Sequence, residues 1–445
     1  MPEITHRKKR LSPFKLIVLG FAVVILLGAL ILMLPFSSTA GVVTPFHEAL
    51  FTSTSAVCVT GLVVQDTGSY WSAFGQAIIL LLIQIGGLGV VTVAAFFAML
   101  SGRKISLMQR STMQDAISAP KVGGIVRLTR FIVRGTFLIE LIGMIVMLPT
   151  FCRNFGIKGI WMAAFHSVSA FCNAGFDILG TAENKYPSLT GYIGDPTINI
   201  AIMLLIIVGG IGFLTWEDIY TNKWHFKKYH MQSKVILVTT AILIIAPAVF
   251  FFFCDFTGLP LAERILASLF QSVTPRTAGF NTVDLPAMTG SSKAIMILLM
   301  LVGGSPSSTA GGMKTTTLAV LILSAFSVCC KKDDTEVCGR RIDGSAVKNA
   351  AAVAVMYFLM FFTGGIVISM AEGLPLSTCL YETASAVGTV GLTLGITPQL
   401  GVLSQLILIV LMYLGRVGGL TLIYAAVPNK NQSGAKLPLE KITVG

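Results

Sequence analysis

Long apolar runs alternate with short ones along most of the chain. Runs of about 20 residues, the length that crosses a bilayer as a helix, occupy residues 14–34, 131–151, 235–253 and 350–370. Each is followed by a shorter apolar stretch, such as 45–57 or 375–387, and then by a second long run, at 77–100, 198–214, 294–325 and 402–426. The short stretches are too short to span, so the pattern predicts a re-entrant helix between each pair of spanning helices.

Each short stretch ends in a similar segment, in which small and polar residues lead to a glycine and a large apolar residue. The four segments read Val59-Thr60-Gly61-Leu62, Asn173-Ala174-Gly175-Phe176, Thr277-Ala278-Gly279-Phe280 and Thr389-Val390-Gly391-Leu392. Their glycines are 114, 104 and 112 residues apart, which indicates an internal repeat. We expect four repeats, at residues 1–100, 101–225, 226–330 and 331–445, each with a spanning helix, a re-entrant helix with its glycine loop, and a second spanning helix.

The predicted fold class is therefore an all-α membrane protein with eight transmembrane helices. Of its 445 residues 54% are hydrophobic and only 12% are charged, whereas soluble proteins carry about 25% charged residues. A soluble fold of this size cannot bury so much apolar chain. The uninterrupted runs also argue against a transmembrane β-barrel, whose strands alternate apolar and polar residues.

The net charge of +12 indicates how the chain is oriented rather than a nucleic-acid partner, which we do not expect. The two termini and the links between repeats contain 24 Lys and Arg residues, and the side that carries the glycine loops contains six: Arg153, Lys158, Lys185, Arg264, Arg276 and Lys293. Cytoplasmic segments carry the excess of basic residues. The bias predicts a multi-pass protein with both termini in the cytoplasm and the glycine loops near the outer face.

The glycine loops have a pattern that suits an ion pathway. Non-helical backbone at membrane depth is tolerated where it is buried in protein or lines a water-filled cavity. Four loops that converge on one pseudo-fourfold axis would form rings of carbonyl oxygens able to replace an ion's hydration shell. The re-entrant helices would direct their partly negative C-terminal ends at this axis, which favours a cation. The loop segments contain no Asp or Glu, so a monovalent cation fits better than calcium, without separating potassium from sodium.

The alternative is that these glycines only let helices pack closely, as small residues often do in membranes. We expect that simpler role for three other glycine pairs in the second helices: Gly86-Gly87, Gly209-Gly210 and Gly418-Gly419.

The four segments resemble the selectivity filter of the Trk/Ktr/HKT superfamily of potassium transporters, and the chain is most similar to the bacterial Ktr transmembrane subunits. The resemblance covers nearly the whole chain and implies a potassium-channel-like pore. It assigns the potassium filter to three residues in each repeat: Val59, Thr60, Gly61, Asn173, Ala174, Gly175, Thr277, Ala278, Gly279, Thr389, Val390 and Gly391. In plant relatives a serine in place of the first-repeat glycine accompanies sodium preference. Gly61 therefore implies potassium selectivity.

The third repeat departs from the others within its second apolar run. Residues 303–314 are rich in Gly, Ser and Thr, include Pro306, and cannot hold a regular helix well. Broken backbone inside a membrane often marks function in transporters, and the resemblance implies an intramembrane gating loop here. The predicted gate residues are Gly303, Gly304, Ser305, Pro306, Gly311, Gly312, Lys314 and Arg416. Arg416 either faces the pore and repels cations or reaches the cytoplasmic interface, and Lys314 either pairs with the gate or lies at the membrane boundary.

The resemblance also implies partners and a location. We expect a homodimer in the bacterial plasma membrane, in contact with membrane lipids and docked to a cytosolic ring of Ktr regulatory subunits that bind ATP or ADP. The permeant ion would be potassium, with sodium as a second candidate, and we expect no organic cofactor in this chain.

Two other classes of function are alternatives to an ion pathway. An alternating-access secondary cation symporter is the first alternative, but the expected inverted repeats are missing, because these repeats share one topology. A membrane-embedded enzyme is the second. It would need a cluster of acids, histidines or a nucleophile with its base, and the sequence indicates none, so we expect no enzyme.

Overall fold

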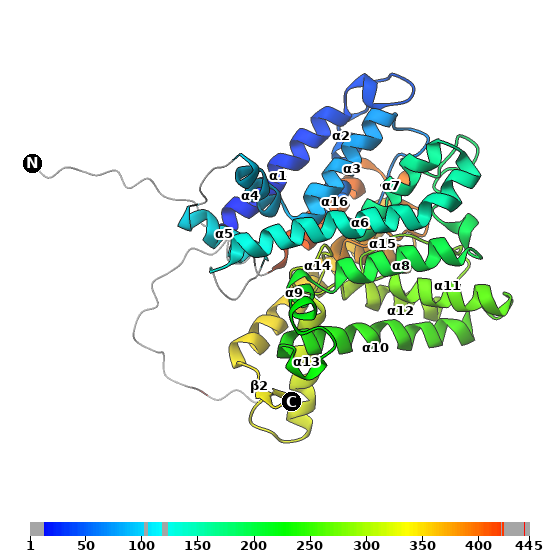
Figure 1. The fold of residues 1–445 in the computed structure, drawn as a ribbon. Coiled ribbons are helices and arrows are strands. Elements are labelled where there is room, and N and C mark those ends of the chain that lie inside the picture. The colour runs from blue at the N-terminus through cyan, green and yellow to red at the C-terminus, as the bar shows by residue number, and fades with distance from the viewer. Residues whose placement is uncertain (1–12, 102–105, 118–122, 420, 422–439, 441–445) are drawn as a thin grey trace, which may run out of the picture.

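The computed structural model describes residues 13–101, 106–117, 123–419, 421 and 440 (Figure 1). The predicted end of the last helix at 426 and most of both basic termini lie outside these residues. The first predicted repeat contains α1 (Pro13–Leu32), η1 (Pro35–Ser37), α2 (Phe46–Val57), α3 (Ala73–Leu88) and α4 (Val90–Leu100). The second contains α5 (Leu107–Ile117), α6 (Ile125–Phe155), α7 (Lys158–Phe171), η2 (Thr190–Tyr192), α8 (Pro196–Gly210) and α9 (Phe213–Asn222).

The third contains η3 (Phe226–Lys228), α10 (Met231–Cys254), α11 (Leu261–Val273), α12 (Gly290–Leu301) and α13 (Thr315–Cys329). The fourth opens with an antiparallel hairpin of β1 (Glu336–Val337) and β2 (Arg340–Arg341), in which Glu336 lies opposite Arg341. It continues with α14 (Gly344–Glu372), α15 (Leu376–Gly388), η4 (Thr397–Gln399) and α16 (Val402–Val417). Each predicted repeat thus has a long helix, a short helix, a non-helical segment and further helix.

The long helices α1, α6, α10 and α14 are long and apolar enough to cross a membrane. Helix α10 shows why they suit lipid: Val238, Ile242, Ile245, Val249 and Phe253 form an exposed stripe at spacings of three and four residues. Its other face buries side chains such as Ile236 and Phe251. The long helices therefore present one apolar face outward and pack with the other.

The short helices α2, α7, α11 and α15 lie inside this layer. Helix α2 is held against α1 by Ser53, whose Oγ donates to the Ile25 carbonyl at 2.7 Å, and α7 is held against α6 by Ser167, whose Oγ donates to the Glu140 carbonyl at 2.6 Å. Their last turns are buried, as in the run from Thr52 to Val57. The short helices are thus packed in protein rather than in lipid.

The second helices are not continuous, which corrects the sequence-based expectation. Helices α3 and α4 meet at an angle of 96°, as do α8 and α9. In the third repeat residues 302–314 separate α12 from α13, and in the fourth α16 ends at Val417. Four helices alone are long enough to span, or up to six if each bent pair counts as one span, among the described residues. The predicted number of eight therefore holds only if every broken second helix is counted as one crossing.

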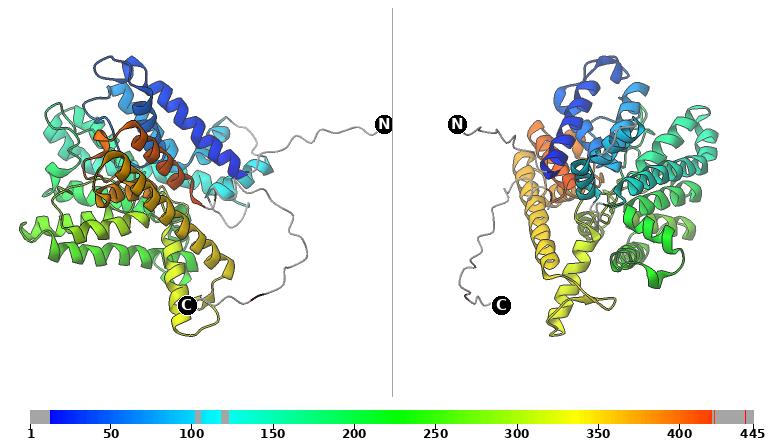
Figure 2. Two further views of the ribbon diagram at one scale, coloured as in Figure 1. Left: turned by 180° about the vertical axis from the view of Figure 1, so that it is seen from behind. Right: turned by 60° about the vertical axis from the view of Figure 1, so that its left-hand side comes forward.

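The repeats surround a common centre. In the right-hand view of Figure 2 the blue helices of the first repeat lie at the top, green helices at the right, and yellow to orange helices below and to the left. Contacts along the chain close this arrangement, because α16 of the last repeat packs against α2 of the first. The short helices and the segments that follow them are directed toward this centre.

Candidate functional site

The four glycine segments adopt the same backbone conformation. Two residues before each glycine a non-glycine residue has a positive φ: Val59 (56°), Asn173 (59°), Thr277 (67°) and Thr389 (52°). The glycines are also left-handed, with φ of 91° at Gly61, 67° at Gly175, 82° at Gly279 and 96° at Gly391. Positive φ is costly for residues with a Cβ, so the surrounding structure must hold it. Alternating the sign of φ turns successive carbonyl groups toward the same side of the chain, as a carbonyl-lined filter requires.

The segments meet in a closed ring. A Cβ atom added to Gly61 would lie 3.2 Å from Cα of Gly175, and one on Gly175 would lie 2.8 Å from Cα of Gly279. A Cβ on Gly279 would lie 3.2 Å from Cα of Gly391, and one on Gly391 would lie 3.0 Å from Cα of Gly61. Each glycine therefore contacts the next repeat, and the fourth contacts the first. The close approach of the four backbones explains why each position needs a residue without a side chain.

Hydroxyl groups tie each segment to the short helix before it. Ser55 and Ser385 accept hydrogen bonds at 3.0 Å from the amides of Gly61 and Gly391, each six residues later. In the second repeat Ser169 Oγ donates to the Phe176 carbonyl at 2.7 Å, and in the third the Thr274 hydroxyl donates to the Phe280 carbonyl. These bonds help to hold the strained backbone in place.

The predicted filter residues are buried at the centre of the molecule. Ala174, Ala278 and Val390 have no exposed surface. The hydroxyl oxygens of Thr60 and Thr389 are buried and lack a hydrogen-bond partner among the described residues. Oxygen atoms of this kind suit a bound monovalent cation, together with the carbonyls of the ring.

Arg276 was counted among the basic residues on the side of the glycine loops, but its side chain is buried. It lies three residues before Gly279 and is 5% exposed, and one guanidinium nitrogen lies 3.4 Å from the Thr240 hydroxyl in α10. The side chain therefore points into the protein behind the third segment. The sequence could not reveal this, because the partner is more than 30 residues away.

The predicted gate segment lies next to the ring. Gly303 approaches the Thr277 side chain, Gly311 approaches Thr389, and Gly312 lies beside Gly388 at the end of α15. The Thr309 hydroxyl donates to the Phe171 carbonyl, the last residue of α7, at 3.1 Å. The segment thus contacts the second, third and fourth repeats on one side of the ring.

The segment also has internal order. The Gly303 amide donates to Met313 O at 2.8 Å and the Thr315 amide donates to Gly304 O at 3.0 Å, so both ends are paired. Ser305 Oγ lies 3.1 Å from the Thr315 hydroxyl. The carbonyl of Pro306 lies beside Gly212, at the bend between α8 and α9.

The two basic side chains among the predicted gate residues, Arg416 and Lys314, bind different groups. The Arg416 guanidinium donates to the Thr309 carbonyl in the gate segment and to the Gly86 and Gly87 carbonyls at the end of α3. These backbone carbonyls hold the Arg416 guanidinium within the protein rather than at its outer surface. Lys314 Nζ folds back onto its own segment, where it donates to Ala310 O at 2.7 Å and to Gly311 O at 3.3 Å.

Sequence reasoning missed the glycines that break the second helices. Gly89, Gly212 and Gly418 share φ between 85° and 93° and ψ between 134° and 141°. The signal is present in the sequence, since each follows another glycine by three residues, in Gly86–Gly89, Gly209–Gly212 and Gly415–Gly418.

The first glycine of each pattern packs on a short helix. Added Cβ atoms at Gly86, Gly209 and Gly415 would meet the carbonyls of Val57, Phe171 and Val387, so the expected packing role holds for the first two. The pair Gly418-Gly419 was expected to be a packing surface, and its two residues differ: Gly418 ends α16, whereas an added Cβ at Gly419 would meet the side chains of Met356 and Tyr357.

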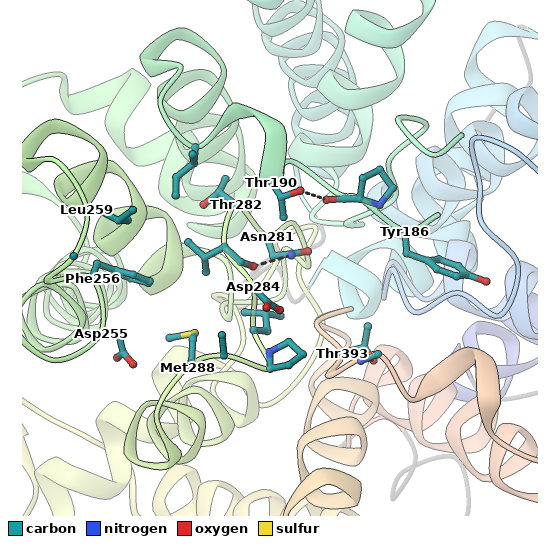
Figure 3. A pocket seen from close by; sticks show the side chains of 18 of the residues that line it. Tyr186, Thr190, Asp255, Phe256, Leu259, Asn281, Thr282, Asp284, Met288 and Thr393 are labelled. Carbon is teal, nitrogen blue, oxygen red and sulfur yellow. Dashed lines mark hydrogen bonds between the residues drawn. The ribbon is translucent and has the colours of Figure 1, made fainter. Parts of the chain in front are cut away.

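A cavity lies among the loops that follow the glycine segments (Figure 3). It has a volume of about 810 Å³ and is lined by the loops that follow three of the segments, including Tyr186, Asn281 and Thr393. The Asp284 carboxylate faces it in Figure 3. The described residues thus form a narrow ring of backbone with a loop packed beside it, and a cavity among the loops that follow the glycine segments.

Comparison with known proteins identifies the family. Residues 12–434 match the family described as TrkH, cation transport protein. The chain is 39% identical to the potassium/sodium uptake protein NtpJ of Enterococcus hirae, over 98% of both chains. It is 36% identical to the Ktr system potassium uptake protein B of Bacillus subtilis, over 98% of this chain and 97% of that one.

A solved structure shares the fold. The crystal structure of the potassium transporter TrkH from Vibrio parahaemolyticus matches with a TM-score of 0.75 at 17% identity, over 95% of this chain and 86% of that chain. This likeness confirms the predicted all-α membrane fold, and the matches in sequence confirm the resemblance to the Trk and Ktr proteins. The chain therefore belongs to the TrkH family of cation transport proteins.

Proposed function

We propose that the chain is the pore subunit of a Ktr-type potassium uptake system, and that potassium passes through the ring formed by the four glycine segments. The observation that carries the proposal is the closed contact of Gly61, Gly175, Gly279 and Gly391, each in the same left-handed conformation. Backbone carbonyls in such a ring replace the hydration shell of a monovalent cation. Relatives named for potassium uptake, one of them also for sodium, agree with this cargo.

In this proposal the filter is built from three residues per repeat, ending at each glycine, and residues 303–314 gate the passage below it. Arg416 acts with the gate, because it joins Thr309 of the segment to the end of α3 and adds a positive charge near the ion path. The C-terminal ends of α2, α7, α11 and α15 add partial negative charge at the ring.

The assembly is part of the proposal. The relative from Bacillus subtilis is named as a component of a Ktr system. We therefore propose a homodimer in the bacterial plasma membrane with cytoplasmic termini, regulated by a separate cytosolic ring that binds ATP or ADP. The basic links between repeats would contact that ring and anionic lipid headgroups.

The filter is tested by potassium uptake in uptake-deficient bacteria that express Gly61→Ser or Gly279→Ser. Both positions have positive φ and touch the next repeat, so a side chain must displace the ring. We expect selectivity for potassium over sodium to fall by about tenfold, which corresponds to about 1.4 kcal/mol. Gly290→Ser is the control, because an added Cβ there meets nothing within 4 Å. Unchanged selectivity in both expressed variants would disprove the filter.

The gate is tested in the same cells by deleting residues 305–310. We expect faster potassium uptake that no longer depends on a regulatory subunit, because the segment beside Thr277 and Thr389 is removed. An unaltered rate would show that the segment does not gate.

A further inference from the structure

The bend between α8 and α9 leaves backbone groups without partners in their own helices. A helix end has unpaired carbonyls and a helix start has unpaired amides, and buried groups of this kind need other partners. Here the partners come from the predicted gate segment. The Ser305 amide donates to Gly210 O at 2.9 Å, the Thr309 amide donates to Gly209 O at 3.3 Å, and the Phe213 amide donates to Ser307 O at 2.6 Å.

Gly212 makes this arrangement sterically available. Its φ of 93° and ψ of 141° suit glycine only, and an added Cβ would lie 2.5 Å from the Pro306 carbonyl and 3.5 Å from the Ser307 carbonyl. Gly418 has nearly the same conformation, with φ of 85° and ψ of 139°, but no atom of the described residues lies within 4 Å of its added Cβ. Gly212 and Gly418 thus share one backbone shape, and of these two only Gly212 touches the gate segment.

We propose that the α8–α9 bend is the seat of the gate segment, and that Gly212 is the positioning residue that keeps the seat open. When the segment leaves, α8 and α9 join into one continuous helix. This inference rests on the proposed gate and adds the element on which the gate closes.

The hydrogen bonds available in a continuous helix support the joined state. In a continuous helix the Phe213 amide would pair with Gly209 O, which lies four residues earlier, and the Leu214 amide would pair with Gly210 O. The carbonyls released by Ser305 and Thr309 are therefore satisfied again without water. In the bent state the Trp216 indole donates to Val208 O at 2.9 Å, which helps to hold the bend. The backbone groups at the junction of α8 and α9 thus have partners in both the bent and the joined arrangement.

The experiment compares Gly212→Ala with Gly418→Ala in the full-length protein. Alanine disfavours the positive-φ backbone at both sites, but only at residue 212 does its methyl group also meet the gate segment. For Gly212→Ala we expect potassium uptake without a regulatory subunit to rise by roughly tenfold, as the loss of one hydrogen bond from the seated state predicts. For Gly418→Ala we expect no rise.

Amide hydrogen exchange separates a switch from simple damage. In Gly212→Ala the amides of Ser305 and Thr309 should lose protection, whereas that of Phe213 should keep it, because it pairs again within the joined helix. Loss of protection at all three amides would indicate local unfolding and would overturn the proposal. So would unchanged protection at all three. The expected exchange pattern with unchanged uptake would support the seat and contradict the gate, so the two proposals fail separately.

Discussion

Asp177 lies two residues after Gly175, the glycine of the second segment in the proposed filter. Its Oδ1 accepts a hydrogen bond from the Leu179 amide at 3.1 Å. Burial raises the pKa of Asp177 to about 7, and the nearby charge of Asp66 raises it further against the opposing effect of the Leu179 amide. Around this pKa the carboxyl gains negative charge as pH rises and loses it as pH falls. In the proposed orientation the relevant pH is that outside the cell.

We expect the apparent affinity for external potassium to fall by roughly threefold as external pH drops from 8 to 6, because one partly screened negative charge is lost. Asp177→Asn should behave at every pH as the wild type does in acid. The measurement is initial uptake rate against potassium concentration at several external pH values. Asp284→Asn, at the neighbouring cavity, is the comparison and should retain the dependence. A wild-type profile that is flat across this range would refute the role of Asp177.

At the same scale, single residues show where sequence reasoning stopped. That Gly61, Gly175, Gly279 and Gly391 form one set was predictable because four copies repeat one pattern at nearly equal spacing. The contacts of Arg276 and Arg416 were not, because their partners are distant in sequence: Thr240 for the first, and Thr309 with Gly86 for the second. Apolar runs indicate depth in the membrane but not which backbone carbonyl receives a buried guanidinium.

Among the elements, the long helices followed from the length of their apolar runs, since a spanning helix needs about 20 residues. The breaks in the second helices did not, because hydropathy does not distinguish a straight apolar helix from a bent one. The breaks depend on φ at Gly89, Gly212 and Gly418, and on packing against the short helices. The break between α12 and α13 was predictable because the composition of residues 303–314 itself disfavours a helix.

The contact between α6 and α7 gives an element-scale prediction. A Cβ on Gly143 would lie 2.6 Å from Ser167 Oγ and 2.7 Å from Leu205 Cδ1. Gly143→Leu should therefore push α7 away from α6 and destabilise the protein by about 1–3 kcal/mol, as overpacking does. The measurement is thermal unfolding in detergent. Gly344→Leu is the matched control, since its Cβ meets nothing within 4 Å, and an equal loss in both variants would contradict the packing argument.

For the whole molecule, the asymmetry of basic residues predicts its orientation in the membrane. The exposed Cys338 lies in the hairpin between the third and fourth repeats, and the exposed Lys185 lies in the loop after the second filter segment. In a chain with Cys152 and Cys254 replaced by Ser, a membrane-impermeant maleimide should label Lys185→Cys in intact cells. Native Cys338 should react only after the cells are permeabilised. Labelling of Cys338 from outside would reverse the proposed orientation.

The ring of four glycines also has a consequence for how this protein varies by mutation. In an assembly of four identical chains, one codon change alters every position of the ring at once. Here Gly61, Gly175, Gly279 and Gly391 belong to a single polypeptide, so each substitution alters one quarter and leaves three intact. In the proposed filter, ion preference would therefore change in smaller steps than in such an assembly. For the same reason one quarter was free to acquire a long loop, and another an arginine, that the others lack.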